Sequence, residues 1–491
     1  MAWPNVPLEL QRPFFKVFHS LKEPPMLSFQ QVDRKWGRRE FLRAGGLGLG
    51  GFGLNQLLQT RSALASDANP LVRDRSVIFL FLHGGPSQTE TFDPKMSAPS
   101  GVRSATGAIP TALPSIQFGS TFPKLASLAD KFSIVRSFQS GDGNHDIKPI
   151  VCRATSGANL GSLYGRMAGT NHPESGMPRN AALFPRCVDA ETQPANLGFG
   201  NFSSTGSLGS AYAPFIPGGG GEAQQAMKLQ FESTHLDDRR SLLSGLDRIR
   251  RDIDTRGSLQ GLDRFQEQAF STILGGVAEA FDLSREDAGT VTRYDTAPLV
   301  RPEEISKKWN NYNNYVDNAK TLGKLLLLAR RMCEAGCGFV TVTTNFVWDM
   351  HSDVNNATMQ EGMQYMGWPL DHAVSALIED LEARGLDDRI MLVVTGEMGR
   401  TPKINAKGGR DHWGGLTPLM VYGGGLKGGQ VIGHSTADAG APASTPIKLE
   451  HLVSTVMHNL LDMGKLRTMT GIPNDLLRSI TAADPIQELV G

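Results

Sequence analysis

Cysteine, net charge and long apolar runs are all scarce in this chain. Its 491 residues include four cysteines and no CxxC pair, which argues against a thiolate zinc site. Lysine and arginine together number 49, and so do aspartate and glutamate, which argues against nucleic-acid or anionic-membrane binding by bulk charge. No later segment reaches about 18 uninterrupted apolar residues, so we expect no membrane span in the mature chain.

The first 65 residues predict a leader rather than part of the fold. Arg38 and Arg39 precede a weakly apolar, glycine-rich stretch at 44–58, as in a twin-arginine export signal, and Ala-Leu-Ala at 63–65 fits a cleavage site. An ordinary amphipathic helix would not explain these three features together. We therefore expect the twin-arginine export machinery to deliver a mature protein, starting near Ser66, to the periplasm or the extracellular space. Because that route carries folded proteins, often with a cofactor, it weakly favours a bound metal.

Apolar runs of strand length alternate with amphipathic helices in most of the mature chain. Runs such as SVIFLFLH (76–83) are typical of strands buried on both faces of a parallel sheet. The alternation predicts α/β layers over a mostly parallel sheet. The expected strands are 76–83, 132–136, 339–344, 389–395 and 418–422, and the expected helices are 122–131, 315–335, 371–384 and 447–461.

The pattern changes between about residues 190 and 314. A Gly/Ser/Pro-rich loop (191–222) is followed by a charged helical segment (223–285) with several i,i+4 pairs of opposite charge. We interpret this region as a loop-rich and helical cap inserted into one domain, 66–491. Cys333 and Cys337 stand near a helix end, where a disulfide is an alternative to the favoured interpretation, buried free thiols.

Carboxylates and imidazoles gather where the predicted strands end. Ligands of open α/β sheets bind beyond the carboxyl ends of the strands. Asp349 and His351 are two residues apart, so in extended chain both side chains point the same way. Such a mixture of oxygen and nitrogen ligands suits a divalent metal ion. The candidates in chain order are His83, His145, Asp146, Asp349, His351, Glu397, Arg400, Asp411 and His412.

Structural interpretations compete with these. An isolated Asp-x-His is more often a hydrogen-bonded loop than a ligand pair, and Asp411-His412 could serve only to orient loop amides. The glycine-rich run 422–434 lacks the strand–GxxxxGK[ST]–helix context of a phosphate loop, so a tight surface turn is favoured.

Six motifs, taken in order, resemble the exported bacterial family called domain of unknown function 1501. They are HGGPSQTETFDPK, LLLLARRMCEAGCGFVTVTT, WDMH, GEMGRTPKIN, GRDHW and VYGGGLKGGQVIG, and the resemblance spans roughly residues 34–470. That family is considered sulfatase-like, within the alkaline phosphatase superfamily. The resemblance implies a three-layer α/β/α sandwich, one or two metal ions held by Asp and His at strand ends, and an alkoxide nucleophile.

The resemblance also carries over residue roles. Asp349 and His351 stand at the position of the superfamily's metal-binding strand end, and His412 stands where a late histidine ligand arrives. Glu397-Met398 replaces the usual Asp-His pair, although a thioether is a poor ligand for Zn²⁺, Ca²⁺ or Mg²⁺. His83 follows the first strand, where enzymes of the superfamily have Asp.

The nucleophile signature CxPxR is missing from NHDIKPIVCRATSG (144–157). Thr155 and Ser156 remain as candidate nucleophiles, with a turn or helix-start role favoured for both.

The sequence therefore predicts an exported metal-dependent hydrolase of phosphate or sulfate esters. Asp349, His351, Glu397 and His412 would hold a Zn, Ca or Mg ion, with His83 or His145 as a further ligand. His145 with Asp146 is the candidate acid–base pair. Arg400 or Arg410 would neutralise an anionic substrate.

Two alternatives stay open. The first is a non-catalytic member of the family that binds a sulfated glycan or a cell-surface partner. The second is a structural periplasmic protein in which Asp411-His412 only fixes loops.

Overall fold

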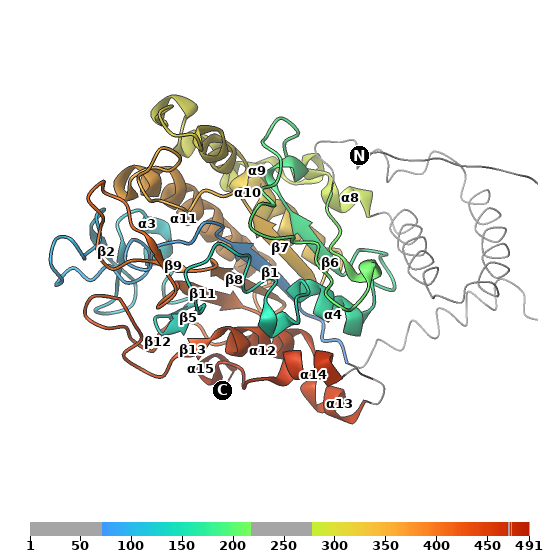
Figure 1. The fold of residues 1–491 in the computed structure, drawn as a ribbon. Coiled ribbons are helices and arrows are strands. Elements are labelled where there is room, and N and C mark those ends of the chain that lie inside the picture. The colour runs from blue at the N-terminus through green and yellow to red at the C-terminus, as the bar shows by residue number, and fades with distance from the viewer. Residues whose placement is uncertain (1–70, 218–276, 470–471, 473, 491) are drawn as a thin grey trace, which may run out of the picture. The chain divides into compact units, whose positions relative to one another are not determined.

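A computed structural model describes residues 71–217, 277–469, 472 and 474–490 of the chain (Figure 1). The predicted leader and twin-arginine signal, and most of the charged helical segment 223–285, lie outside the described residues. Those two assignments therefore stay predictions.

A seven-stranded sheet forms the centre of the described chain. Its order is β12 (Gln430–Ile432), β4 (Ser133–Val135), β11 (Leu419–Gly423), β8 (Ile390–Thr395), β1 (Ser76–Phe81), β7 (Phe339–Thr343) and β6 (Asn180–Leu183). Only β11 runs against its neighbours, β4 and β8, and the other pairs are parallel. Phe81 is in register with both Thr343 and Thr395, so β1, β7 and β8 end at one level. The loops that follow these three strands therefore leave from one edge.

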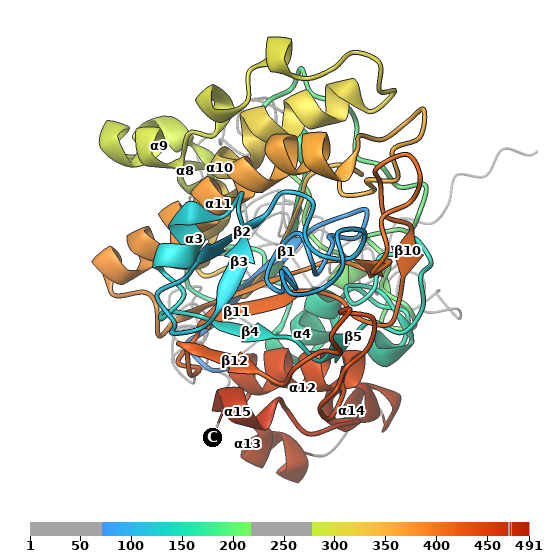
Figure 2. The same ribbon diagram turned by 90° about the vertical axis from the view of Figure 1, so that its left-hand side faces the viewer.

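Helices cover both faces of this sheet (Figure 2). One face carries α10 (Tyr312–Glu334), α11 (Met359–Arg384) and α3 (Pro123–Ser127), and the other carries α4 (Leu160–Ala168) and α12 (Leu449–Leu460). Strand β1 shows the division, because Ile78 and Leu80 pack in the first core whereas Val77, Phe79 and Phe81 pack in the second. The predicted three-layer α/β/α sandwich with a mostly parallel sheet is confirmed.

Shorter elements complete the described chain. Three two-stranded pairs are β2 (Ala108–Pro110) with β3 (Gln117–Gly119), β5 (Phe138–Gln139) with β13 (Ile447–Lys448), and β9 (Gly399–Arg400) with β10 (His412–Trp413). The remaining helices are α8 (Ala278–Phe281), α9 (Ala288–Tyr294), α13 (Met463–Thr468), α14 (Asn474–Thr481) and α15 (Gln487–Val490), and the 3-10 turns are Arg153–Thr155, Pro185–Cys187, Ser210–Tyr212, Leu283–Arg285, Ala297–Leu299 and Pro302–Glu304.

All five predicted strands are present, but α11 begins twelve residues before the predicted start, at Met359 rather than 371. The first half of α11 contains glycines and Pro369, which are poor helix formers, so the sequence pattern does not predict a helix there. Thr358 begins the helix by accepting a hydrogen bond from the amide of Glu361 at 3.0 Å. The glycine-rich run 422–434 turns at Gly423–Gly425, which all have positive φ, and then adds strand β12.

The described end of the predicted insertion packs on the helical layer. Glu286 accepts hydrogen bonds from Arg330, Arg331 and Arg384 at 2.7, 2.9 and 2.8 Å, which ties the segment before α9 to α10 and α11. All four cysteines are free thiols, and Cys333 and Cys337 are buried. Within the residues that the structure describes, no helix is both long and apolar enough to span a bilayer.

Candidate metal centre

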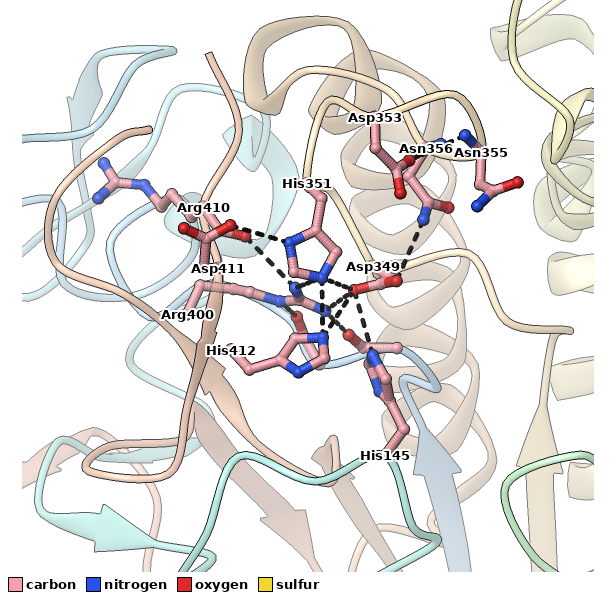
Figure 3. Close-up of polar contacts among 12 residues, drawn as sticks. His145, Asp349, His351, Asp353, Asn355, Asn356, Arg400, Arg410, Asp411 and His412 are labelled. Atoms are coloured by element: carbon pink, nitrogen blue, oxygen red, sulfur yellow. Dashed lines mark hydrogen bonds and ion pairs between the residues drawn. The ribbon is translucent and has the colours of Figure 1, made fainter. Parts of the chain in front are cut away.

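Three chain segments, one at the carboxyl edge of the central sheet and two near the short strands β5 and β10, bring four polar side chains together (Figure 3). Asp349 and His351 follow β7, His145 follows β5, and His412 begins β10. One ligand atom of each lies within 4.8 Å of the others. Among the described residues, this is the one group of three or more His, Cys, Asp or Glu residues arranged so closely.

The four side chains converge on a single carboxylate oxygen. Asp349 Oδ1 lies 2.9 Å from His351 Nε2, 3.3 Å from His145 Nε2 and 3.4 Å from His412 Nε2. The Nε2 atoms of His351 and His412 are 2.7 Å apart. All three imidazoles thus turn the same ring nitrogen inward, although they come from different loops.

Glycines allow these loops to approach closely. Gly84 has a φ of +114°, and a Cβ there would lie 2.6 Å from the amide nitrogen of Asp349. A Cβ at Gly409 would overlap the backbone carbonyl of His351. The antiparallel pair β9–β10 sets His412 opposite Arg400. Gly84 and Gly409 therefore allow the loops that form the centre to pack closely.

Two further carboxylates hold the imidazoles from outside. Glu397 Oε1 lies 3.1 Å from His145 Nδ1 and accepts the Gly84 amide at 2.8 Å, and Asp411 Oδ1 lies 3.1 Å from His351 Nδ1. A carboxylate accepts hydrogen bonds, so it keeps the proton on Nδ1 and leaves the Nε2 lone pair facing the centre. Glu397, predicted as a ligand, thus stands behind a histidine, and Asp411, predicted beside His412, pairs with His351.

Arg400 lies inside the centre and is fully buried. Its Nη2 lies 2.6 Å from Asp349 Oδ1 and donates to the carbonyl of Gly84, and its Nε donates to the carbonyl of Gly85 at 2.8 Å. Its Nη1 lies 3.3 Å from the carbonyl oxygen of Arg410. The guanidinium donors are therefore engaged by the protein itself.

Arg410 is buried away from the four ligand residues. Its guanidinium donates to Glu90 Oε1 at 2.9 Å and to backbone carbonyls, including that of Pro402. Both Arg410 and Glu90 have no exposed side-chain surface. This pair closes the loop that carries Asp411 and His412.

The surroundings of the centre shift the pKa values of Asp349 and His145 in opposite directions. Burial alone would raise the pKa of Asp349, but the Arg400 charge and the close imidazoles of His145, His351 and His412 outweigh it and hold that pKa well below its usual range. Burial would lower the pKa of His145, yet its contacts with Asp349 and Glu397 raise it overall.

The structure places His83 and Asp146 apart from the four converging atoms. His83 is buried against Phe346, at 5.0 Å between ring centroids, and burial lowers its pKa. Asp146 forms an ion pair with Lys148 at 2.9 Å. The carboxylate beside His145 Nδ1 is that of Glu397, from a strand end more than two hundred residues away in the chain.

The candidate nucleophiles also lie in structural roles. Thr155 Oγ1 donates to the carbonyl of Cys152 at 3.0 Å, and the hydroxyls of Ser156 and Ser479 are 2.6 Å apart. Among the described contacts, no hydroxyl or thiol side chain hydrogen-bonds to the four residues of the centre.

The donor set fits a metal ion. Three imidazole nitrogens and one carboxylate oxygen converge, and His145 Nε2 is buried without a hydrogen-bond partner. Histidine nitrogens and a carboxylate oxygen are ligands that zinc sites commonly use. Asp349 Oδ2 accepts a hydrogen bond from Asn356 at 3.1 Å, which fixes the carboxylate. The sequence does not predict this role of Asn356, because its contact with Asp349 depends on the path of the loop between them.

The centre opens to solvent on one side. The side chain of His412 is 34% exposed and that of His351 21%, whereas that of Asp349 is 9% exposed. On the side of His145, aromatic rings close the centre. The ring centroids of Phe199 and Phe346 are 4.3 Å apart, and those of Phe346 and His145 are 4.6 Å apart.

Fold and centre together define an α/β protein with a candidate metal site at the carboxyl edge of its sheet. Residues 74–490 match the family described as protein of unknown function (DUF1501), and the chain belongs to that family. The predicted family membership is thus confirmed. No curated protein matches the chain.

Several solved structures resemble the chain at low sequence identity. The PsFucS1 sulfatase from Pseudoalteromonas sp. is 12% identical over 82% of this chain and 70% of that chain, with a TM-score of 0.33. The phosphonate monoester hydrolase SpPMH from Silicibacter pomeroyi is 11% identical over 78% and 73%, with a TM-score of 0.32. An alkaline phosphatase from the Antarctic bacterium TAB5 is 10% identical over 78% and 98%, with a TM-score of 0.27.

Proposed function

We propose that this protein is a divalent-metal-dependent hydrolase of phosphate or sulfate esters. The observation that supports this is the convergence of three imidazole Nε2 atoms and one carboxylate oxygen within 4.8 Å of one another. His145, Asp349, His351 and His412 would hold the ion. Three nitrogen donors favour Zn²⁺ over Ca²⁺ and Mg²⁺, which prefer oxygen ligands.

A divalent ion held there would polarise the ester oxygen and lower the pKa of a bound water. The protein supplies the orientation. Glu397 and Asp411 keep protons on the outer nitrogens of His145 and His351, so that the inner Nε2 atoms are the ones that would give up a proton and face the ion. Phe199 and Phe346 exclude water behind His145.

Water is the proposed nucleophile. Thr155 and Ser156 hydrogen-bond to Cys152 and Ser479, and no hydroxyl or thiol among the described residues hydrogen-bonds to the centre. Direct attack by water distinguishes this proposal from the alkoxide mechanism that the family resemblance implied. We further propose that the mature protein works after twin-arginine export, in the periplasm or outside the cell.

The test combines metal analysis with turnover. The full chain, expressed in a host with twin-arginine export, is expected to retain a divalent metal after dialysis. The variants Asp349→Asn and His412→Ala should lose that metal, whereas His434→Ala, at an exposed histidine, should keep it. Hydrolysis of 4-nitrophenyl phosphate, bis(4-nitrophenyl) phosphate and 4-nitrophenyl sulfate should fall with the metal. Unchanged metal content in both centre variants would refute the site.

The second candidate is a non-catalytic binder of a sulfated glycan or of a cell-surface partner. The burial of Arg400 and the engagement of its guanidinium by the protein support it, because this cation makes no free contact with a substrate. Metal retention without turnover of any of the three esters, together with metal-dependent retention on an immobilised sulfated polysaccharide, would favour it.

A further inference from the structure

We propose that the centre binds one divalent ion per chain and that the guanidinium of Arg400 occupies the position of a second cation. The inference rests on the proposed metal dependence and specifies it. Two-metal hydrolytic sites hold their ions about 3.5–4 Å apart, so a second ion would need its own ligands beside the first. Beside Asp349, the structure shows a group of oxygen atoms that the Arg400 guanidinium already contacts.

An oxygen cradle surrounds the Arg400 guanidinium. The carbonyl oxygens of Gly84, Gly85 and Arg410 accept from it, and Asp349 Oδ1 lies 2.6 Å from its Nη2. Three carbonyls and one carboxylate are the kind of ligand set that hard divalent cations prefer. In this protein the cradle is filled by a cation that belongs to the chain.

The guanidinium is held in this place. Arg400 is fully buried, and its backbone amide donates to Gln88 Oε1 at 2.9 Å. Its strand β9 pairs with β10, which carries His412. Burial and these contacts hold the charge of Arg400 beside Asp349.

Neither oxygen of Asp349 is left to bridge two ions. Oδ1 faces Arg400 and the three imidazoles, and Oδ2 accepts from Asn356 at 3.1 Å. A carboxylate that bridges two ions through separate oxygens needs both of them free, so Asp349 cannot bridge in that way.

The opposite side of His145 offers too few ligands for a second ion. Glu397 Oε2 and His83 Nε2 are buried there without hydrogen-bond partners. Within the described ranges, however, the close groups of three or more ligand residues include neither Glu397 nor His83. The described side chains therefore provide ligands for one ion.

The experiment measures stoichiometry rather than activity. The metal-free full chain is titrated with Mn²⁺, and bound metal is counted by elemental analysis and by native mass spectrometry. One equivalent is expected to bind, with the six-line electron paramagnetic resonance spectrum of an isolated ion, and His412→Ala should abolish it. Two equivalents with an exchange-coupled spectrum would overturn the inference and leave the proposed metal dependence intact. No bound equivalent, with Mn²⁺ or with Zn²⁺, would overturn both.

Variants of Arg400 test the role of its charge. Arg400→Ala empties the cradle and removes the charge, so a second Mn²⁺ equivalent and a coupled spectrum are expected. Arg400→Lys keeps a cation there, and one equivalent is expected. If folded Arg400→Ala also stops at one equivalent, the guanidinium does not act as the second cation. If Arg400→Ala fails to fold, the wild-type stoichiometry still decides the number of ions.

Discussion

The two outer carboxylates provide a controlled comparison of how burial affects metal affinity. Glu397 and Asp411 each lie 3.1 Å from the Nδ1 atom of a ligand histidine. Their surroundings differ, because the side chain of Glu397 has no exposed surface and that of Asp411 is 58% exposed. We therefore compare Glu397→Gln with Asp411→Asn, which remove the charge but keep the shape.

The expected difference follows from the dielectric environment. Across an imidazole, a carboxylate lies about 6 Å from a bound ion, where each pair of unit charges interacts by about 3 kcal/mol at an effective dielectric of 20 and by about 0.7 kcal/mol in water. Loss of such an outer partner typically weakens metal binding about 10–100-fold. We expect Glu397→Gln to reach the upper end of this range and Asp411→Asn to stay at or below about tenfold.

Zn²⁺ affinity would be measured by competition with a chromophoric chelator at constant pH, and circular dichroism would confirm that both variants fold. Equal losses in the two variants would refute the argument from burial. Wild-type affinity in Glu397→Gln would refute the assignment of Glu397 as the group that orients His145.

Four further predictions concern the scaffold. Glu90→Gln should lower the free energy of unfolding by about 3–5 kcal/mol in urea, because it leaves Arg410 charged and buried; a loss below about 1 kcal/mol would contradict this. Gly409→Ala should weaken Zn²⁺ binding about tenfold or more by displacing His351, whereas Gly101→Ala, where a Cβ meets open space, should not. Three arginines outweigh the burial of Glu286 and lower its pKa from 4.5 to about 2, so its stabilisation, on the order of 2 kcal/mol, is present above pH 4.5 and is lost as the pH falls towards 2. Unfolding of Glu286→Gln should accordingly depend less on pH in that window, and an unchanged slope would count against the network. Burial raises the pKa of Cys337 to about 12, so its thiol should resist alkylation at pH 8 until urea unfolds the chain, as followed by mass spectrometry.

The sequence predicts the sheet well because its central strands are continuous apolar runs. Strands β1, β7 and β8 are buried on both faces, and such runs are distinctive. It misses α4 and β6, which are short, and the first half of α11, where Pro369 and glycines are tolerated by tertiary packing.

The sequence predicts that the candidate site lies at the strand ends, but it does not predict which residues contact one another there. The rule that ligands gather at the carboxyl edge, together with the family resemblance, points to Asp349, His351 and His412 as candidates. Which side of an imidazole a carboxylate occupies depends on loop paths, so Glu397 and Asp411 could not be assigned from spacing. Adjacency in the chain suggested that Asp146 serves His145, yet Asp146 turns instead to Lys148.

Under the proposed function, the charge of Arg400 has a consequence for the kind of ester that the centre would accept. With a divalent ion, the positive charge of the ion and Arg400 equals the negative charge of Asp349, Glu397 and Asp411. A neutral centre of this kind offers no surplus of positive charge to a doubly ionised monoester. It would discriminate in favour of singly charged groups, such as sulfate monoesters and phosphate diesters, because these bring half as much uncompensated charge into a site that is already balanced.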